Sequence, residues 1–330
     1  MKGFDPKFRD FPDYILGITE EIWEGRGIHT LHDYYAPDII VRSPGSVVVG
    51  NDGVIAATMA TLAEFPDRKL LGEDVIWCGT PEAGMLSSHR IVSTATHLGD
   101  GVYGRATGTK LCYRILADCH ARANRIDDEW LIRDQGAIVR QLGWDVVDYA
   151  RDLIDREGGP EACVRPLTPD IDRPGPYRGN GNDDEWGLRH VDLLARIMNA
   201  DMAAIGAEYD RAATVNYPGG HTGHGHGPAD RFWMGLRAAF PSATFTVHHR
   251  IGRQDPTLPP RSAVRWSLDG RHDGWGAFGR PTGARVHVLG ISHAEWGAVS
   301  PGRGARLRRE WTLYDETAIW KQILLQTGEV

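Results

Sequence analysis

Two aspartates, Asp134 and Asp315, are the residues of this sequence best suited to acid–base chemistry. Each follows a tryptophan by four positions, since Trp130 precedes Asp134 and Trp311 precedes Asp315. Alternate residues of an extended strand share a face, so each Asp is expected to point the same way as its Trp. A carboxylate that faces an apolar cavity loses hydration, which raises its pKa toward neutrality and suits a general acid or base.

Each aspartate also stands directly before a segment with a helical pattern, at 135–141 and at 316–322. An Asp in that position is a common N-cap, because its carboxylate accepts the free backbone N–H groups of the first turn. A capping role therefore stays open beside the catalytic one, and the two can coexist.

The Trp–Asp pairs belong to a long internal repeat. The segment GRATG at 104–108 answers to GRPTG at 279–283, and the offset is 174 from Tyr35 to Tyr209. Two copies of about 140 residues indicate tandem globular domains and not a solenoid. We expect a first domain over 1–156, a Pro- and Gly-rich linker over 157–185 and a second domain over 186–330.

Within each copy, helical patterns come first and strand patterns follow. Ile15, Ile18 and Ile22 fall at helical spacing, whereas later segments bounded by Gly, Pro or Asp are typical of strands. These strand-like segments of the first copy are 74–77, 89–96, 111–119 and 130–133. The order predicts an α+β domain in which an antiparallel sheet carries helices on one face.

This order of features resembles the NTF2-like superfamily and, more narrowly, the SnoaL-like polyketide cyclases. The resemblance rests on the turn at 104–108, His120, Glu129-Trp130, Asp134 and the Gln-Leu-Gly segment at 141–143. It implies two tandem NTF2-like (cystatin-like) cone domains, each a curved antiparallel sheet with helices packed on one face. It also implies a cofactor-independent aldol ring closure, in which Asp134 is the acid/base and His120 assists it.

Histidines near the repeated turns are further candidates. His120 and His293 stand late in the strands after the turns, where a neutral imidazole could orient a carbonyl or share a proton with the Asp. A lone strand histidine is more often a hydrogen-bonded core residue, and His97 and His272 carry the same two interpretations. The resemblance favours the first copy as the active one, and the second copy departs from the pattern by an insertion around Ala298 to Ala305 that could reshape or cover its pocket.

The remaining pocket candidates are aromatic or basic. Trp130 and Trp311 are the tryptophans expected to contact a cavity that encloses an apolar or aromatic small molecule. Arg105 and Arg280 could bind an anionic group of that molecule. An Arg beside a Gly-rich turn, however, more often pairs with a local carboxylate or carbonyl.

One cluster is not repeated. His221, His224 and His226 place three imidazoles within a six-residue segment, and such groups can hold zinc or nickel. The intervening glycines instead favour a flexible loop without a physiological metal. The chemistry considered above needs no cofactor.

Composition excludes several classes of partner. A formal net charge of -7 with interspersed signs gives no basic surface for nucleic acid. The chain contains neither a run of about 18 apolar residues nor the apolar core of a signal peptide, so we expect no membrane span and a cytoplasmic location.

The sequence therefore predicts an acid–base enzyme of the cyclase, isomerase or hydrolase type that acts on a small apolar carbonyl compound. The alternative is a non-catalytic protein that binds a small ligand. In either case the two copies are expected to pair within the chain as a pseudo-dimer, because NTF2-like domains often pair through their sheets. A further homodimer is compatible with the sequence.

Overall fold

The computed structural model describes residues 1–298 and 304–329. Helix α1 (Phe11–Thr19) begins at Asp10, whose side chain accepts a hydrogen bond from the Asp13 N–H, and it continues into a π-helical turn at Glu20–Glu24. Its apolar face is buried, as the helical spacing predicted. The other helical segments of the first domain are a 3-10 turn (Ile28–Thr30), α2 (Leu31–Tyr34), α3 (Asn51–Glu64), α4 (Gln135–Gln141) and α5 (Val146–Arg156).

The first sheet has six strands in the order β2-β1-β6-β5-β4-β3. They are β1 (Tyr35–Ser43), β2 (Ser46–Val49), β3 (Lys69–Thr80), β4 (Gly84–Thr96), β5 (Lys110–Arg122) and β6 (Arg125–Arg133). Strands β1 and β6 run parallel, while the other neighbours are antiparallel. The sequence predicted an antiparallel sheet, and this one pair differs from that prediction. Parallel strands need a crossover connection, and the chain between β1 and β6 is long enough to provide it.

The second domain repeats this plan. Its sheet order is β8-β7-β12-β11-β10-β9, again with one parallel pair, β7 and β12. The helices are α6 (Glu185–Met198), α7 (Ala203–Glu208), α8 (His226–Ala239) and α9 (Glu316–Thr327). The strands are β7 (Tyr209–Tyr217), β8 (His221–His224), β9 (Thr244–Arg253), β10 (Arg261–Arg271), β11 (Arg285–Ala298) and β12 (Ala305–Leu313). Both domains therefore have the predicted α+β architecture of two tandem NTF2-like cones.

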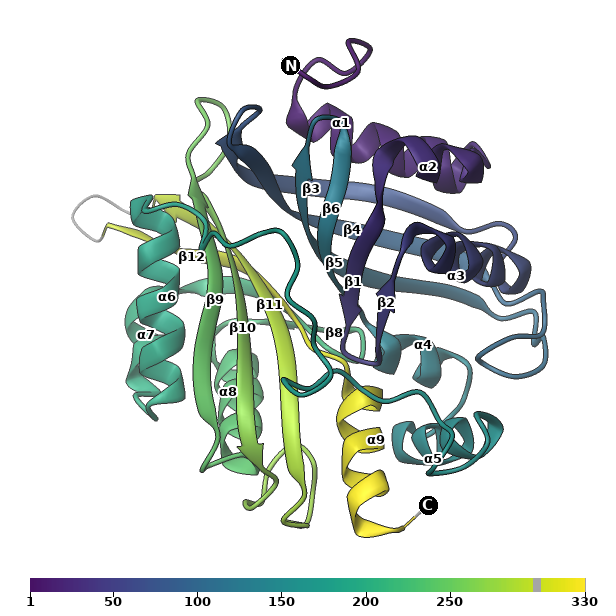
Figure 1. Ribbon diagram of the computed structural model, residues 1–330. Helices are drawn as coiled ribbons and strands as arrows, with labels where there is room; N and C mark the ends of the chain where they lie inside the picture. Colours follow the sequence, from purple (N-terminus) through teal and green to yellow (C-terminus); the bar gives the residue numbers. More distant parts are fainter. Residues whose placement is uncertain (299–303, 330) are drawn as a thin grey trace.

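The two sheets face each other across the middle of the molecule, and most helices lie on the outer sides (Figure 1). Apolar residues from both sheets, including Leu116 and Ile132 of the first and Ile291 and Leu313 of the second, form one buried cluster. Each sheet is thus covered on both faces, by its own helices on one and by the other sheet on the second. This arrangement is the internal pseudo-dimer that the repeat predicted.

The segment between α5 and α6 runs along both domains. No helix or strand crosses residues 157–184, all of which the structure describes. The Leu167 N–H donates to the Pro44 carbonyl of the first domain (2.9 Å), and Gly181 forms an isolated bridge with Arg250 of the second. Its contacts therefore help to hold the two domains together.

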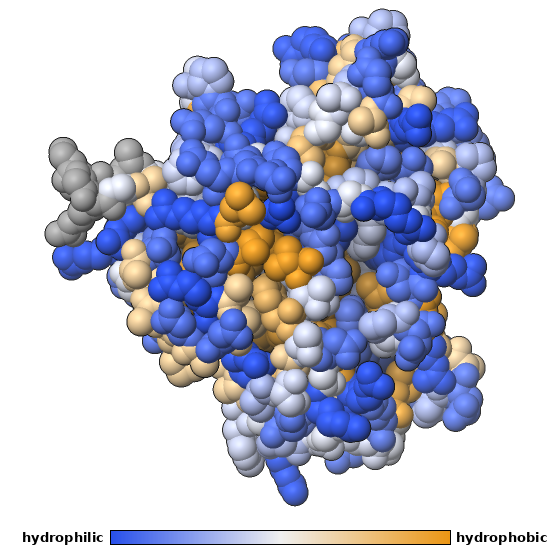
Figure 2. Space-filling view, turned by 60° about the vertical axis from the view of Figure 1, so that its left-hand side comes forward, coloured by the Kyte–Doolittle hydropathy of each residue, from blue (hydrophilic) through white to orange (hydrophobic). Residues whose placement is uncertain are grey.

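The surface in the view of Figure 2 is mainly hydrophilic, with an apolar area near its centre and smaller ones toward its right-hand side. Within residues 1–298 and 304–329, no helix combines the length and the apolar character that crossing a membrane requires.

Candidate functional site

Asp134 is the N-cap of α4. Its carboxylate accepts hydrogen bonds from the backbone N–H groups of Ala137 (3.0 Å), Gly219 (2.8 Å) and Gly220 (2.9 Å), of which the last two belong to the second domain. Burial raises its pKa to about 6, although these three N–H groups lower it. The capping role is confirmed, and the carboxylate lies between the domains.

A small pocket surrounds this carboxylate. It has a volume of about 190 Å³, and Asp134, Asn216, His221 and Trp311 are among the residues that line it. Trp130 is not among them, so the two tryptophans do not share one cavity. The sequence-based expectation of an apolar cavity around Trp130 and Asp134 is therefore corrected to an interdomain pocket.

His120 lies far from Asp134. Its Nδ1 is 2.5 Å from the Asp127 carboxylate, and its ring centroid is 4.9 Å from that of Tyr177 in the linker. The Asp134 N–H donates to the carbonyl of Arg114, which precedes His120 by six residues on β5. Six residues of strand span roughly 20 Å. The structure thus corrects the expectation that these two side chains share a proton.

Asp315 and His293 are buried in the second copy. Asp315 caps α9 by accepting from the N–H groups of Thr317 (2.8 Å) and Ala318 (3.2 Å), and burial raises its pKa to about 6. His293 Nε2 is 2.8 Å from the Ser88 hydroxyl of the first domain, and burial lowers its pKa well below the usual value. Both side chains therefore have interdomain or capping roles. The central part of the insertion predicted around 298–305 lies outside the described residues.

The strand register also corrects the pairing of histidines between the copies. His293 lies opposite Trp311, whereas Asp118 lies opposite Trp130. His293 is therefore the counterpart of Asp118 and not of His120.

Trp130 and Trp311 contact arginines across the domain interface. The Arg265 guanidinium carbon lies 3.5 Å from the Trp130 ring centroid, and the Arg90 guanidinium carbon lies 3.4 Å from that of Trp311. Arg90 and Arg265 are themselves repeat counterparts, so the contact is reciprocal, as a two-fold interface requires. The tryptophans thus join the domains.

His97 and His272 hold the repeated turns. In each copy, Nδ1 lies 3.1 Å from a threonine hydroxyl of the turn, Thr107 for His97 and Thr282 for His272. His97 Nε2 is also 3.2 Å from the Glu64 carboxylate. Both histidines are fully buried, as expected of hydrogen-bonded core residues.

The other sequence candidates lie toward the surface. Arg105 and Arg280 are exposed at the tips of the turns. His221 and His224 are exposed on β8, whereas His226, at the start of α8, has its Nε2 3.2 Å from the backbone carbonyl of Tyr209. Within 1–298 and 304–329, no three His, Cys, Asp or Glu side chains are grouped closely enough to hold a metal ion.

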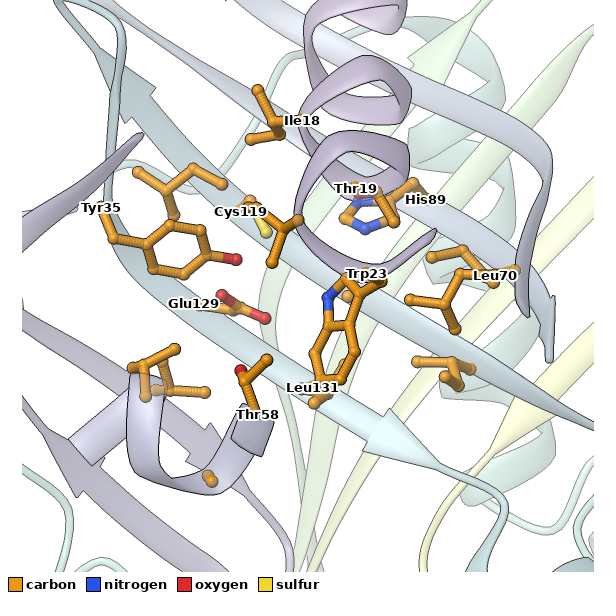
Figure 3. A pocket seen from close by; sticks show the side chains of 18 of the residues that line it. Ile18, Thr19, Trp23, Tyr35, Thr58, Leu70, His89, Cys119, Glu129 and Leu131 are labelled. Atoms are coloured by element: carbon orange, nitrogen blue, oxygen red, sulfur yellow. The ribbon is translucent and has the colours of Figure 1, made fainter. Parts of the chain in front are cut away.

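The cone of the first domain contains an apolar cavity with a volume of about 150 Å³. It lies between the sheet and the helices α1 and α3 (Figure 3). Most of its lining is apolar, and its polar groups are few: Tyr35, Thr58, Arg68, His89, Glu129 and Arg133 are the main ones. This composition is typical of a small-molecule site.

Glu129 is the acid of this cavity. It is buried, and burial raises its pKa to about 7, while hydrogen bonding by Tyr35 lowers it. The Tyr35 hydroxyl and the Glu129 carboxylate point toward each other (Figure 3), and Glu129 Oε2 has no hydrogen-bond partner among the described residues. A buried carboxyl group that titrates near neutrality can accept and return a proton at physiological pH.

His89 and Cys119 also line the cavity. Burial lowers the pKa of His89 to about 4, so its ring is uncharged at neutral pH. His89 Nδ1 is 3.3 Å from the Ser87 hydroxyl on the same face of β4. Burial raises the pKa of Cys119 well above its ordinary value, so its thiol is protonated.

The face of β6 that lines the cavity is opposite to the one that the Trp–Asp spacing predicted. Trp130 and Asp134 point to the domain interface, and Glu129, Leu131 and Arg133 point into the cone. A shift of one residue along a strand exchanges its two faces. The signal that could have found Glu129 is its recurrence as Glu310, beside Trp311 in the second copy.

The cone of the second domain is filled by tryptophans. Helices α3 and α8 correspond residue by residue, so cavity residue Thr58 is replaced by Trp233. Ile91 is likewise replaced by Trp266, because it follows Arg90 as Trp266 follows Arg265. Both tryptophans are fully buried in the core of that domain.

Glu310, the counterpart of Glu129, is fully hydrogen-bonded. It accepts from the hydroxyls of Tyr209 (2.7 Å), Tyr217 (2.7 Å) and Thr312 (2.9 Å). The side chains around it are buried in the core of that domain, which supports a structural role for the same Glu–Tyr pair there. The first cone, in contrast, has a cavity beside its acid.

Comparisons with known proteins agree with this architecture. A SnoaL-like polyketide cyclase family model matches residues 14–142, and a SnoaL-like domain model matches residues 189–298. No curated protein sequence matches the chain.

Several solved structures are similar to one domain. IdmH from Streptomyces antibioticus, provisionally named a polyketide cyclase, is 26% identical over 40% of this chain and 97% of its own, with a TM-score of 0.35. A SnoaL-like polyketide cyclase from Agrobacterium tumefaciens is 19% identical over 42% and 98%, with a TM-score of 0.32. TsrD from Streptomyces laurentii is 17% identical over 40% and 93%, with a TM-score of 0.35.

The two family matches follow one another along the chain and together include both cones. With the repeated sheet order and the reciprocal interface, they show that this chain belongs to the SnoaL-like family and carries two such domains in tandem.

Proposed function

We propose that the first domain is an acid–base enzyme acting on a small, largely apolar carbonyl compound, with Glu129 as the group that moves the proton. The observation that carries the proposal is a buried carboxyl group with a pKa of about 7 that lines an apolar cavity. Its counterpart in the second domain, Glu310, instead accepts three hydrogen bonds within the core. The second domain would then act as a scaffold that covers the outer face of the first sheet.

The chemistry needs few groups. Ionised Glu129 takes a proton from the carbon next to the carbonyl, the C–H electron pair forms a C=C bond, the π pair of the carbonyl moves onto its oxygen, and an enolate results. Tyr35 donates a hydrogen bond to the carboxylate and fixes its position, and the uncharged His89 ring offers a hydrogen bond to the substrate oxygen. The enolate can then attack a second carbonyl, as in a cyclase, or be reprotonated elsewhere, as in an isomerase.

Proton exchange is the test, because cyclisation and isomerisation of this kind share that step. Cyclohexanone and phenylacetone are incubated with the full chain in deuterated buffer, and loss of the proton signals beside the carbonyl is followed by NMR. We expect exchange above the buffer rate with the wild type and at least a hundredfold loss with Glu129→Gln.

Asp134→Asn provides the comparison, because Asp134 has a similarly raised pKa but lies in the interdomain pocket. Retained exchange in this variant supports the cavity of the first domain as the site. Exchange that survives Glu129→Gln and disappears with Asp134→Asn would move the chemistry to the interdomain pocket.

A binding protein without turnover is the second candidate. The observation that favours it is the presence of the same Glu–Tyr pair in the filled second cone, where Glu310 is fully hydrogen-bonded. Binding of either ketone with no exchange above the buffer rate at any pH between 6 and 9 would support this candidate.

A further inference from the structure

Two arginines, Arg68 and Arg133, line the cavity of the first domain, and Arg133 lies four residues beyond Glu129 at the end of β6. Arg68 is 3% exposed, and its Nη1 has no hydrogen-bond partner among the described residues. The Nε atom of Arg133 is also buried without a partner there. Each of the two guanidinium groups at the wall of this cavity thus has a buried N–H group without an acceptor among the described residues.

Most neighbours of these two arginines are uncharged, but one carboxylate acts on Arg133 from a longer distance. Burial lowers the pKa of Arg133, whereas Tyr113, Tyr103 and the Asp315 carboxylate raise it above its ordinary value. Arg68 Nε donates to the Ser93 hydroxyl at 3.3 Å, and its guanidinium carbon lies 4.5 Å from the Trp23 ring centroid. Within 1–298 and 304–329, no carboxylate oxygen lies within 4.0 Å of either guanidinium. Burying a charge without a partner is costly, so an unpaired buried cation at a cavity indicates that a ligand supplies the missing charge.

Other buried arginines of the chain show the contrast. Each has a carboxylate partner, and the pairs are Arg42 with Asp128, Arg90 with Glu73, Arg261 with Asp74, and Arg265 with Asp118. Pairing within the protein is therefore the usual solution in this fold, and the two cavity arginines depart from it.

The second domain loses both arginines together with its cavity. Arg68 follows Phe65-Pro66 as Ala243 follows Phe240-Pro241, and Arg133 precedes Asp134 as Tyr314 precedes Asp315. The positions are the same in the fold, since the N–H of Arg68 and that of Ala243 both donate to the corresponding Phe carbonyl at 3.1 Å. The two positive charges thus accompany the open cone and are absent from the filled one.

The local electrostatics agree. Burial alone would raise the pKa of Tyr113, yet the guanidiniums of Arg68 and Arg133 outweigh it and lower that pKa. Burial lowers the pKa of Arg68 to about 10, which leaves the group charged at neutral pH. The potential beside the two arginines is therefore positive, while the acid Glu129 lies on the wall it shares with Tyr35.

We propose that Arg68 and Arg133 form a carboxylate-binding site, and that the cavity of the first domain takes a ring-sized carboxylic acid. The planar guanidinium fork matches a carboxylate, with two parallel N–H···O bonds. An engineered apolar cavity of about 150 Å³ in another protein binds benzene, so a volume of this size suits one ring. Binding of such an acid is independent of the proposed function. That the acid is also the substrate, with a carbonyl group that faces Glu129, rests on the proposed function.

Benzoate and its neutral analogue benzamide are the probes, titrated into the untagged full chain by isothermal titration calorimetry at pH 7.5. We expect benzoate to bind at least tenfold more tightly than benzamide. Arg68→Met and Arg133→Gln should each weaken benzoate binding at least tenfold and leave benzamide binding within threefold. Arg9→Gln is the matched control, because this side chain is 84% exposed, and it should change neither affinity.

Thermal unfolding of the free variants separates recognition from structure. Because Arg68 is buried and unpaired, Arg68→Met should keep or raise the melting temperature in the absence of ligand. If that variant does not fold, Arg133→Gln decides the question by itself. Equal affinity for benzoate and benzamide, no benzoate binding at 10 mM or unchanged benzoate affinity in the folded arginine variants would each overturn the carboxylate site.

Glu129→Gln keeps the two proposals distinguishable. It should retain benzoate binding within threefold while it removes proton exchange. Exchange that depends on Glu129 without selective benzoate binding would leave the acid–base proposal standing and overturn the carboxylate site. Benzoate binding without exchange of any ketone would do the reverse.

Discussion

Replacement of Glu129 by glutamine should stabilise the protein at high pH and leave its stability nearly unchanged at low pH. Burial raises the pKa of Glu129 from the ordinary 4.5 to about 7. A carboxyl group whose pKa is raised by folding contributes stability below its unfolded value, and that contribution is lost as the pH rises through the folded value. The window is therefore pH 4.5 to about 7.

The magnitude follows from the same two values. One pH unit corresponds to about 1.4 kcal/mol, so ionising Glu129 in the folded protein costs about 3 kcal/mol at pH above both values. Glutamine has nearly the same shape and carries no charge. The free energy of unfolding of Glu129→Gln should accordingly exceed that of the wild type by about 3 kcal/mol at pH 8.5 and by less than about 0.5 kcal/mol at pH 4.5.

Urea unfolding at a series of pH values is the assay, followed by both tryptophan fluorescence and circular dichroism. The two probes must give coincident transitions for a single free energy to be extracted. Glu82→Gln is the control, because the Glu82 side chain is 60% exposed and its loss should change the free energy of unfolding by less than about 0.5 kcal/mol at every pH. A difference for Glu129→Gln that does not grow between pH 4.5 and 8.5 would refute the reasoning.

Three more perturbations test the same picture. Tyr35→Phe removes a hydrogen bond that lowers the pKa of Glu129, so the rise of the ketone exchange rate with pH should move to higher pH; an unmoved profile would count against the pair. Thr58→Trp copies the residue that fills the second cone and should weaken phenylacetone and benzoate binding more than tenfold in calorimetry, while the circular dichroism spectrum stays unchanged. Arg265→Met leaves buried Asp118 unpaired and should destabilise the protein by about 3 to 5 kcal/mol at pH 7 in urea unfolding, but less at pH 4, where the carboxyl group can be protonated. A loss of equal size at both pH values would contradict that account.

The fold could be predicted because its signals are repeated. The helical spacing of Ile15, Ile18 and Ile22 and the paired turns at 104–108 and 279–283 occur in one order in both copies. The family matches and the two sheets confirm the tandem SnoaL-like architecture. The internal pseudo-dimer could also be predicted, because two fused copies of a domain that pairs through its sheet can form that pair within one chain.

The site could not be predicted in the same way, for a physical reason. Alternation along a strand identifies a cavity face only when the opposite face is exposed to water, and here both faces of β6 are buried. Trp130 and Asp134 were predicted to line the cavity because a large aromatic residue and an acid share one face of the strand. That face, however, packs on the sheet of the second domain. Glu129, on the opposite face, entered only as part of the Glu129-Trp130 pair of the family resemblance, and a single glutamate beside a tryptophan does not show which face of the strand lines a cavity.

Duplication explains how one chain can keep both an open cone and a filled one. The reciprocal contacts of Trp130 with Arg265 and of Trp311 with Arg90 require both copies, so the interface preserves the sheet faces of each domain. The inner faces are free of that requirement, because neither cone takes part in the interface. Thr58 can therefore be exchanged for Trp233 in one copy without loss of the pairing, and the filled cone becomes a rigid support. A protein built in this way should tolerate changes inside the second cone only when they keep it filled, whereas changes inside the first cone should affect ligand binding before they affect the fold.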